Sequence, residues 1–152
     1  MMPFPILNLV QIFQTPDHVA ILNEENHPMR IIPLDGRPHV GPEIRLWHGD
    51  SRAHWESDTL VIDITNFDGK GAFRGAGPNL HVSERFRRVD ADTISYEFSV
   101  ADADTWVQPW TAEIPLRRTV GPLFEHACHE GNYSLVNILS AARSADSKGR
   151  RR

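Results

Sequence analysis

The chain has 152 residues and a formal net charge of −4, with 16 Lys and Arg against 20 Asp and Glu. This length suits one domain with a hydrophobic core, and the interleaved charges exclude the basic face that non-specific nucleic-acid binding needs. A single cysteine, Cys128, excludes an internal disulfide and every zinc motif built from several cysteines.

No stretch approaches the roughly 18–20 apolar residues of a membrane span, and no signal peptide is visible at the N-terminus. We therefore expect a cytoplasmic protein as the chain is written, or a periplasmic or secreted one if a leader precedes it. Residues 1–143 are interpreted as one domain. The basic residues 144–152 are interpreted as a disordered, solvated tail.

Prolines and glycines interrupt the chain about every ten residues, which is typical of an antiparallel all-β domain. We expect strands at 9–13, 19–22 and 29–34, forming a meander, and an irregular stretch at 41–52 with a short extended piece at 44–47. The clearest strand is 59–65, where Leu60, Ile62 and Ile64 share one face and Asp63 lies on the other.

The second half begins with a glycine-rich loop at 66–79, interpreted as a mobile lid or a poorly ordered connection. Further extended segments are expected at 81–89, 94–100 and 106–118, and one helix at 132–143. These elements predict an all-β fold: an antiparallel, lipocalin-like barrel or strongly curved sheet, closed by one C-terminal helix. A cone-shaped α+β fold is the alternative, although it would need more helix near the N-terminus.

Glu84 is the most informative residue, because strand alternation places it on the same face as Leu80, Val82 and Phe86. A buried carboxylate is costly unless it is paired, hydrogen-bonded or protonated. Glu84 is therefore either a structural ion-pair partner or a tuned acid/base, and the pattern leaves both interpretations open. The candidate partners are the many arginines of the chain, such as Arg45, Arg52 and Arg74.

Three other residues are candidates to orient Glu84 or to supply a second proton: His81, Asp63 and His129. His81 lies three residues before Glu84, so on a regular strand the two side chains point to opposite faces and form no dyad. Asp63 can pair with a histidine if the barrel interior lies on its side of the strand; otherwise it is an exposed residue.

Residues 125–130 are the densest collection of possible metal ligands. On a strand His126, Cys128 and Glu130 share one face, and zinc and iron sites use such side chains. No second histidine pair supports this spacing, so a metal site stays a lesser hypothesis and Cys128 is interpreted as a buried, inert thiol. No cofactor is expected for the leading hypothesis.

Large aromatic side chains are frequent for this length. They fit core packing, and they also fit a cavity for a flat or hydrophobic molecule. The expected partner is a small hydrophobic or aromatic compound, with no nucleic acid and no membrane. The candidate ligand-binding residues are Trp47, Trp55, Tyr96, Trp106 and Trp110.

Residues 54–67, HWESDTLVIDITNF, resemble the WEGDTLVVDTTNF signature of a large family of small, mostly uncharacterised bacterial proteins. Residues 79–86, 89–94 and 109–111 and the ACHEGNY block at 127–133 agree with it, so the resemblance spans about residues 4–143. It implies family membership and no particular activity. Ser57 replaces the usual glycine, and His126 stands where tyrosine is usual, beside Cys128 and Glu130.

Three functions follow from these patterns. The first is a cofactor-independent lyase, isomerase or cyclase that uses Glu84 as acid/base, with a pKa raised by its apolar surroundings. The second is a non-catalytic barrel that binds a small molecule. The third is a metal-dependent enzyme that uses the 126–130 segment. The first strands fit pairing within one barrel and across a homo-oligomer equally well.

Overall fold

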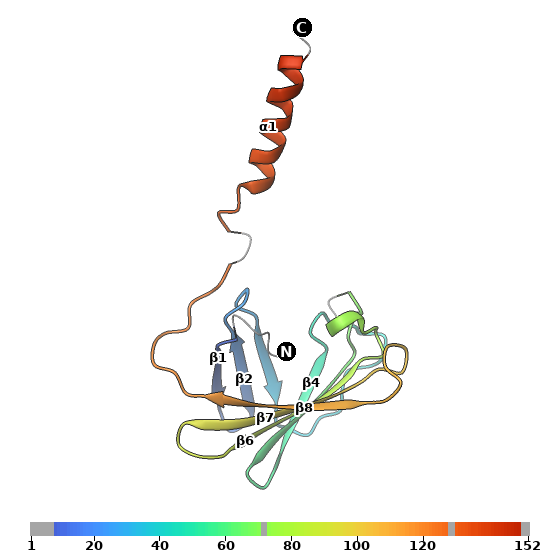
Figure 1. The fold of residues 1–152 in the computed structure, drawn as a ribbon. Helices are drawn as coiled ribbons and strands as arrows, with labels where there is room; N and C mark the ends of the chain where they lie inside the picture. The colour runs from blue at the N-terminus through green and yellow to red at the C-terminus, as the bar shows by residue number, and fades with distance from the viewer. Residues whose placement is uncertain (1–7, 71–72, 128–129, 150–152) are drawn as a thin grey trace.

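The computed structural model describes residues 8–70, 73–127 and 130–149, which form two antiparallel sheets and one helix (Figure 1). The first sheet is a meander of β1 (Val10–Gln14), β2 (His18–Asn23) and β3 (Met29–Pro33). The second sheet has five strands in chain order. These are β4 (Asp50–Glu56), β5 (Thr59–Thr65), β6 (His81–Arg88), β7 (Thr93–Ala101) and β8 (Trp110–Arg117).

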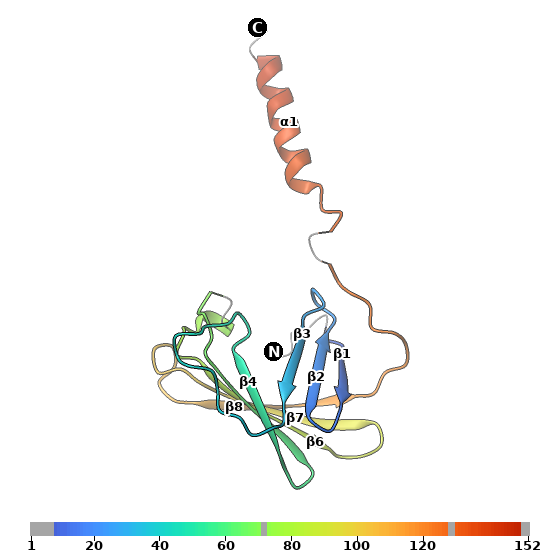
Figure 2. The ribbon, with the colours of Figure 1, turned by 180° about the vertical axis from the view of Figure 1, so that it is seen from behind.

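The mainly antiparallel β architecture with one C-terminal helix is thus confirmed. In the described part of the chain the strand ladders of the two sheets stay separate, so hydrogen bonds do not close a barrel. β3 nevertheless lies beside β4, and the two sheets face each other across the core (Figure 2).

The strand pattern at 59–65 coincides with β5, and the expected meander is present. β4 is a correction, because it begins inside the stretch that was expected to be irregular. Its buried inward side chains are Ser51 and Ala53, and Trp55 on the same face is exposed, so the inner face of β4 lacks the run of large aliphatic residues that marks β5. The extended piece expected at 44–47 is reduced to a single bridge between Leu46 and Phe67.

The core lies between the sheets and follows the strand alternation. Each large apolar side chain that leaves water there stabilises the fold by roughly 1.5–3 kcal/mol. The most deeply buried apolar residues are Val19, Ile21, Ile32, Leu60, Ile62, Ile64, Leu80, Val82, Tyr96 and Val100.

The described parts of the 66–79 loop are held against the second sheet. A short 3-10 turn at Phe73–Gly75 precedes Ala76, which is 3% exposed. The Gly77 N–H then donates to Asp102 Oδ2 at 2.7 Å, and Arg45 Nη1 donates to the Pro78 carbonyl at 2.7 Å. This end of the loop is therefore bonded to two neighbouring segments.

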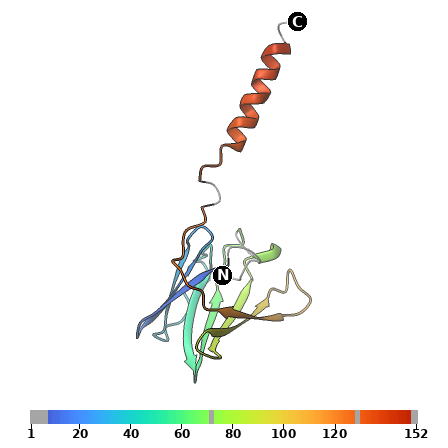
Figure 3. The ribbon, with the colours of Figure 1, turned by 60° about the vertical axis from the view of Figure 1, so that its left-hand side comes forward.

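Helix α1 (Ser134–Gly149) begins two residues later and ends six residues beyond the predicted helix. The prediction that it closes the β domain is wrong, because α1 leads away from both sheets and contacts no strand of the described chain (Figure 1, Figure 3). Its described side chains are exposed. None of the described helices has the length and apolar character required to cross a membrane.

β1 is the outer strand of its sheet, and all five of its residues are exposed. β8 is the outer strand at the far side of the second sheet, and exposed and half-buried residues alternate along it. The two outer strands therefore differ in how much of their surface the fold covers.

Candidate functional site

A chain of acidic and imidazole side chains lies on the outer face of the second sheet, centred on Asp63 of β5. His81 Nε2, from β6, lies 2.5 Å from Asp63 Oδ1, and His39 Nε2 lies 2.9 Å from Asp63 Oδ2. The other ring nitrogen of His39 lies 2.8 Å from Asp50 Oδ2. The order Asp50–His39–Asp63–His81 thus links three strands, β4, β5 and β6, and a loop. We call these four residues the outer-face relay.

The contacts determine which ring nitrogens face the carboxylates. Both ring nitrogens of His39 lie against carboxylate oxygens, and an ionised carboxylate only accepts hydrogen bonds. In His81 Nε2 faces Asp63, so Nδ1 is the ring nitrogen that can accept a proton from another molecule. In the described structure Nδ1 has no protein partner, and the His81 side chain is 50% exposed.

The two carboxylates of the relay have different surroundings. Partial burial of Asp63 acts to raise its pKa, but the hydrogen bonds of His81 and His39 outweigh it, so the pKa lies below the usual value. Asp50 is buried and is held by Arg52 Nη1 at 3.0 Å and by the Val40 N–H at 3.1 Å.

The loop that carries His39 is fixed by its own backbone. The Asn66 side-chain amide, just after β5, donates to the carbonyls of Val40 and Gly41, each at 3.0 Å. Gly49, which precedes Asp50, has a φ of +69°, and a Cβ there would approach the Thr65 carbonyl oxygen to 2.7 Å. The relay therefore depends on a glycine and an asparagine that take no part in it.

A second cluster lies between the sheets, around Glu84 of β6. Glu84 is fully buried; its Oε2 lies 2.7 Å from Arg30 Nη2 of β3, and its Oε1 accepts a hydrogen bond from the Tyr96 hydroxyl at 2.8 Å. Burial by itself would raise the pKa of Glu84, but the Arg30 charge and the Tyr96 hydrogen bond lower it to about 2. The predicted raised pKa is therefore wrong, and the arginine is Arg30 rather than one of the three named examples.

Tyr96 supports this arrangement from β7. Burial, and then the negative charge of Glu84, raise the pKa of the Tyr96 hydroxyl above its usual value, so it stays protonated and remains a donor. The predicted opposition of His81 and Glu84 on their strand is confirmed, because His81 is exposed and Glu84 is buried. Asp63 does pair with histidines, although on the outer face rather than inside.

The interior also contains polar atoms without a bond. Arg30 Nε and Nη1 and the Ser51 hydroxyl are buried and have no hydrogen-bond partner in the described structure. A ladder of aromatic rings continues from Tyr96 through Phe98 to Trp110, with centroids 5.6 and 5.7 Å apart.

The predicted aromatic ligand-binding residues separate into two groups. Tyr96, Trp106 and Trp110 belong to the interior, and the Trp106 and Trp110 rings are 5.9 Å apart, edge to face. Trp47 and Trp55 are exposed and lie outside this ladder. The structure therefore brings together three of the five.

The possible metal segment is only partly described. His126 is exposed; its N–H donates to the Glu24 carbonyl at 2.9 Å and its carbonyl accepts from the Asn26 N–H at 3.1 Å, which ties it beside the β2–β3 turn. Cys128 and His129 lie outside the described residues. Within the described ranges no group of three or more His, Cys, Asp or Glu side chains is arranged to hold a metal ion.

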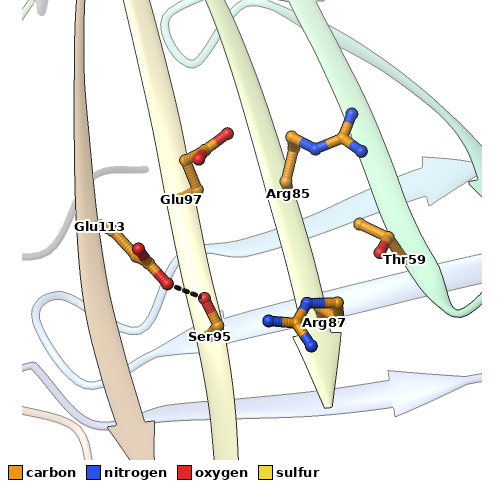
Figure 4. Close-up of a pocket in the computed structure, with 6 residues that line it drawn as sticks. All are labelled: Thr59, Arg85, Arg87, Ser95, Glu97 and Glu113. Carbon is orange, nitrogen blue, oxygen red and sulfur yellow. Dashed lines mark hydrogen bonds between the residues drawn. The ribbon is translucent and has the colours of Figure 1, made fainter. Parts of the chain in front are cut away.

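A shallow hollow of about 320 Å³ occupies the outer face of the second sheet, farther along β6 and β7 than the outer-face relay (Figure 4). Two arginines and two glutamates balance its charge, and Ser95 donates to Glu113 across it. Such a balanced surface does not concentrate a charged ligand. The lining residues are Thr59, Arg85, Arg87, Ser95, Glu97 and Glu113.

Sequence patterns did not indicate His39, Asp50 or Arg30. His39 and Asp50 come from the stretch interpreted as irregular, where no periodicity marks a face, and Arg30 reaches Glu84 from the other sheet. No family model matches this chain, and neither a curated protein nor a solved structure matches it.

Proposed function

We propose that the chain is a cofactor-independent acid/base enzyme of the lyase, isomerase or cyclase type, with His81 as the group that moves the proton. The observation that carries the proposal is the 2.5 Å contact between His81 Nε2 and Asp63 Oδ1, made by a His81 ring that is half-exposed to solvent. A carboxylate that orients an imidazole and stabilises its cation is a recurrent arrangement for general acid/base catalysis.

In this mechanism Nδ1 of His81 removes a proton from a small hydrophobic or aromatic substrate. The resulting imidazolium stays bonded to the Asp63 carboxylate. The same proton then returns to another atom of the substrate in an isomerisation, or protonates the leaving group in an elimination. Nε2 of His39 contacts the second oxygen of Asp63 at 2.9 Å, so the carboxylate is held from both sides and keeps its orientation toward His81.

The proposal gives Glu84 a structural role, because a carboxyl with a pKa of about 2 that is paired to Arg30 is a poor proton acceptor at neutral pH. His129 stays a candidate for a second proton donor. The scaffold would be a curved, lipocalin-like shell, and the chain would belong to the bacterial family that its signature resembles. The 66–79 loop would lie next to the bound substrate.

Solvent isotope exchange tests the proposal before the substrate is known. The protein would be incubated in D2O with a panel of small aromatic and aliphatic carbonyl compounds, and deuterium entry at carbon would be followed by NMR. A proton-transfer enzyme exchanges the acidic hydrogen of a compound that it binds, even when the later step fails. We expect exchange to fall by about 10²–10⁴-fold in His81→Gln.

His54→Gln is the matched control, because His54 is another exposed imidazole on the same face, 3.2 Å from Glu56. It should exchange as the wild type does. Equal exchange in wild type and His81→Gln would exclude His81 as the acid/base.

A second candidate function is the binding of a small aromatic molecule between the sheets without chemistry. Its support is the buried, unbonded Nε and Nη1 of Arg30 next to the aromatic ladder. Binding of aromatic carboxylates would be followed by quenching of tryptophan fluorescence. Arg30→Lys keeps the charge but loses these donors, so the dissociation constant should rise by about tenfold. An unchanged constant would exclude Arg30 as the anchor.

A further inference from the structure

In the described part of the chain two apolar surfaces lie uncovered, one on a sheet and one on a helix. One is the outer face of the β1–β3 sheet, opposite the core. Cross-strand pairing places Phe13, Ala20 and Ile31 in one row and Leu22 and Met29 in the next. Phe13, Met29 and Ile31 are 42, 53 and 65% exposed. We call these five residues the apolar sheet face.

The other surface is one side of α1. Leu135, Ile138, Leu139 and Ala142 follow the i, i+3, i+4, i+7 spacing of a single helix face. All four are exposed, including Leu135 and Ile138 at 68 and 65%. Because α1 contacts no strand of the described chain, this stripe gains nothing from its own domain.

The dimensions of the two surfaces agree. The stripe spans eight residues, or about 12 Å at the rise of an α-helix. A strand of five or six residues is about 17–20 Å long, so the stripe fits within the sheet. A helix that packs on a sheet face covers a central strand and both neighbours, as the two rows of apolar residues require.

Charges favour one orientation. The β2–β3 turn carries Glu24 and Glu25, which attract the positive end of the helix dipole at Ser134. The opposite end of the sheet carries the exposed Asp17 and Asp35, and the sequence places Arg143 and Lys148 in the C-terminal half of α1. The helix would therefore lie with its N-terminus at the turn and its C-terminus at the aspartates.

The chain path indicates which copy supplies the helix. The backbone of His126 is bonded to Glu24 and Asn26, and beyond this anchor the chain leads away from its own sheet (Figure 1, Figure 3). We propose that α1 of one chain docks on the apolar sheet face of a second copy and that the exchange is reciprocal. A twofold dimer makes this contact twice, and exchange of an identical element is a low-cost route to such dimers.

Directed disulfide formation tests the exchange. Two variants would be made in a Cys128→Ser background, one with Ile31→Cys and one with Leu139→Cys, and mixed under mild oxidation. We expect a disulfide between the two different chains. Val89→Cys in place of Ile31→Cys is the control, because Val89 is also exposed, at 53%, but follows β6 and lies outside the apolar sheet face.

Analytical ultracentrifugation gives the second measurement. The wild type should sediment as a dimer, and Leu139→Asp and Ile31→Asp should each raise the dimer dissociation constant by at least about tenfold. Asn137→Asp, on the other side of α1, and Val89→Asp should leave it unchanged. A monomeric wild type would overturn the proposal, whether α1 folds back on its own sheet or stays undocked. A dimer that withstands both aspartate variants would also overturn it.

Discussion

The two faces of the second sheet use buried and exposed charge in different ways. Asp63 on β5 and Glu84 on β6 belong to neighbouring pairs of one ladder, since Asp63 faces Ser83 and Glu84 faces Ile62. Glu84 points inward, where full burial makes a paired arginine and a tyrosine donor necessary. Asp63 points outward and is 41% exposed, so its histidine partners keep contact with water. The buried Glu84 therefore has a structural role, whereas the more exposed Asp63 can take part in a reaction.

The largest effect is expected for Glu84→Gln, because it leaves the buried Arg30 cation without its ionic partner. Removing one partner of a buried pair typically costs roughly 3–5 kcal/mol of unfolding free energy. Urea unfolding, followed by tryptophan fluorescence, measures this loss. Glu113→Gln, at an exposed site of β8, is the control and should change stability very little. A Glu84→Gln variant as stable as the wild type would contradict the structural role of the pair.

The pH dependence of that difference has a definite sign. The pKa of Glu84 falls from 4.5 to about 2 on folding, so ionised Glu84 contributes its full stability above pH 4.5. The contribution is lost as the pH falls from 4.5 to about 2. The unfolding free energies of wild type and Glu84→Gln should therefore converge across this range, and a gap that stays constant would show that the charge of Glu84 is not its origin.

Tyr96→Phe should have the next largest effect. It removes the hydroxyl that donates to Glu84 at 2.8 Å and keeps the ring in its aromatic ladder. A hydrogen bond to a charged group contributes about 1.5–3 kcal/mol, which the same unfolding measurement resolves. Tyr133→Phe is the control, since Tyr133 is 69% exposed. Equal losses of unfolding free energy in both variants would mean that the hydrogen bond from Tyr96 to Glu84 does not stabilise the fold.

Asp63→Asn should cost about 1 kcal/mol or less, because solvent screens the half-exposed outer-face relay. The pKa of Asp63 lies below 3.8 in the folded chain, so its contribution is complete above that pH and is lost as the pH falls through the lower folded value. A more direct test is to determine the tautomer of the His81 ring by nitrogen NMR. The wild type should hold hydrogen on Nε2, and the variant should lose that preference. An unchanged tautomer would mean that Asp63 does not orient the ring.

The smallest effect is expected for Arg85→Gln, which breaks the exposed pair of Arg85 and Glu56 at 2.9 Å. Exposed ion pairs contribute about 0.2–1 kcal/mol, and salt screens them. Unfolding in low and high salt should show a small difference that vanishes at high salt. A loss as large as that of Glu84→Gln would remove the distinction between the two faces.

The sequence pattern of a single strand correctly predicted which of its side chains face the core. The alternation of Leu80, Val82 and Phe86 put Glu84 in the core, where it lies. The strand pattern could not predict the partner of Glu84, because Arg30 belongs to the other sheet. The position of one sheet over the other depends on tertiary packing. The pKa direction failed for the same reason, since the sign depends on the partner rather than on burial alone.

The outer-face relay was only half predicted. Asp63 was expected to find a histidine, and His81 lies on the adjacent strand of the same sheet. His39 comes from a loop whose path is fixed by Asn66 and Gly49, and neither residue leaves a periodic signal. β4 was missed because small and polar residues occupy most of its inner face, so an alternation of large apolar side chains is absent there.

The exposed outer strand β1 has a consequence for solubility. Val10–Gln14 carries no charge and no proline, and among the described residues its outer edge pairs with no further strand, which is the combination that recruits strands into aggregates. The outer strand on the other sheet, β8, contains Pro115 and Arg117, which hinder such addition. Of these two outer strands, β1 is therefore the one at which the addition of a further strand is favoured.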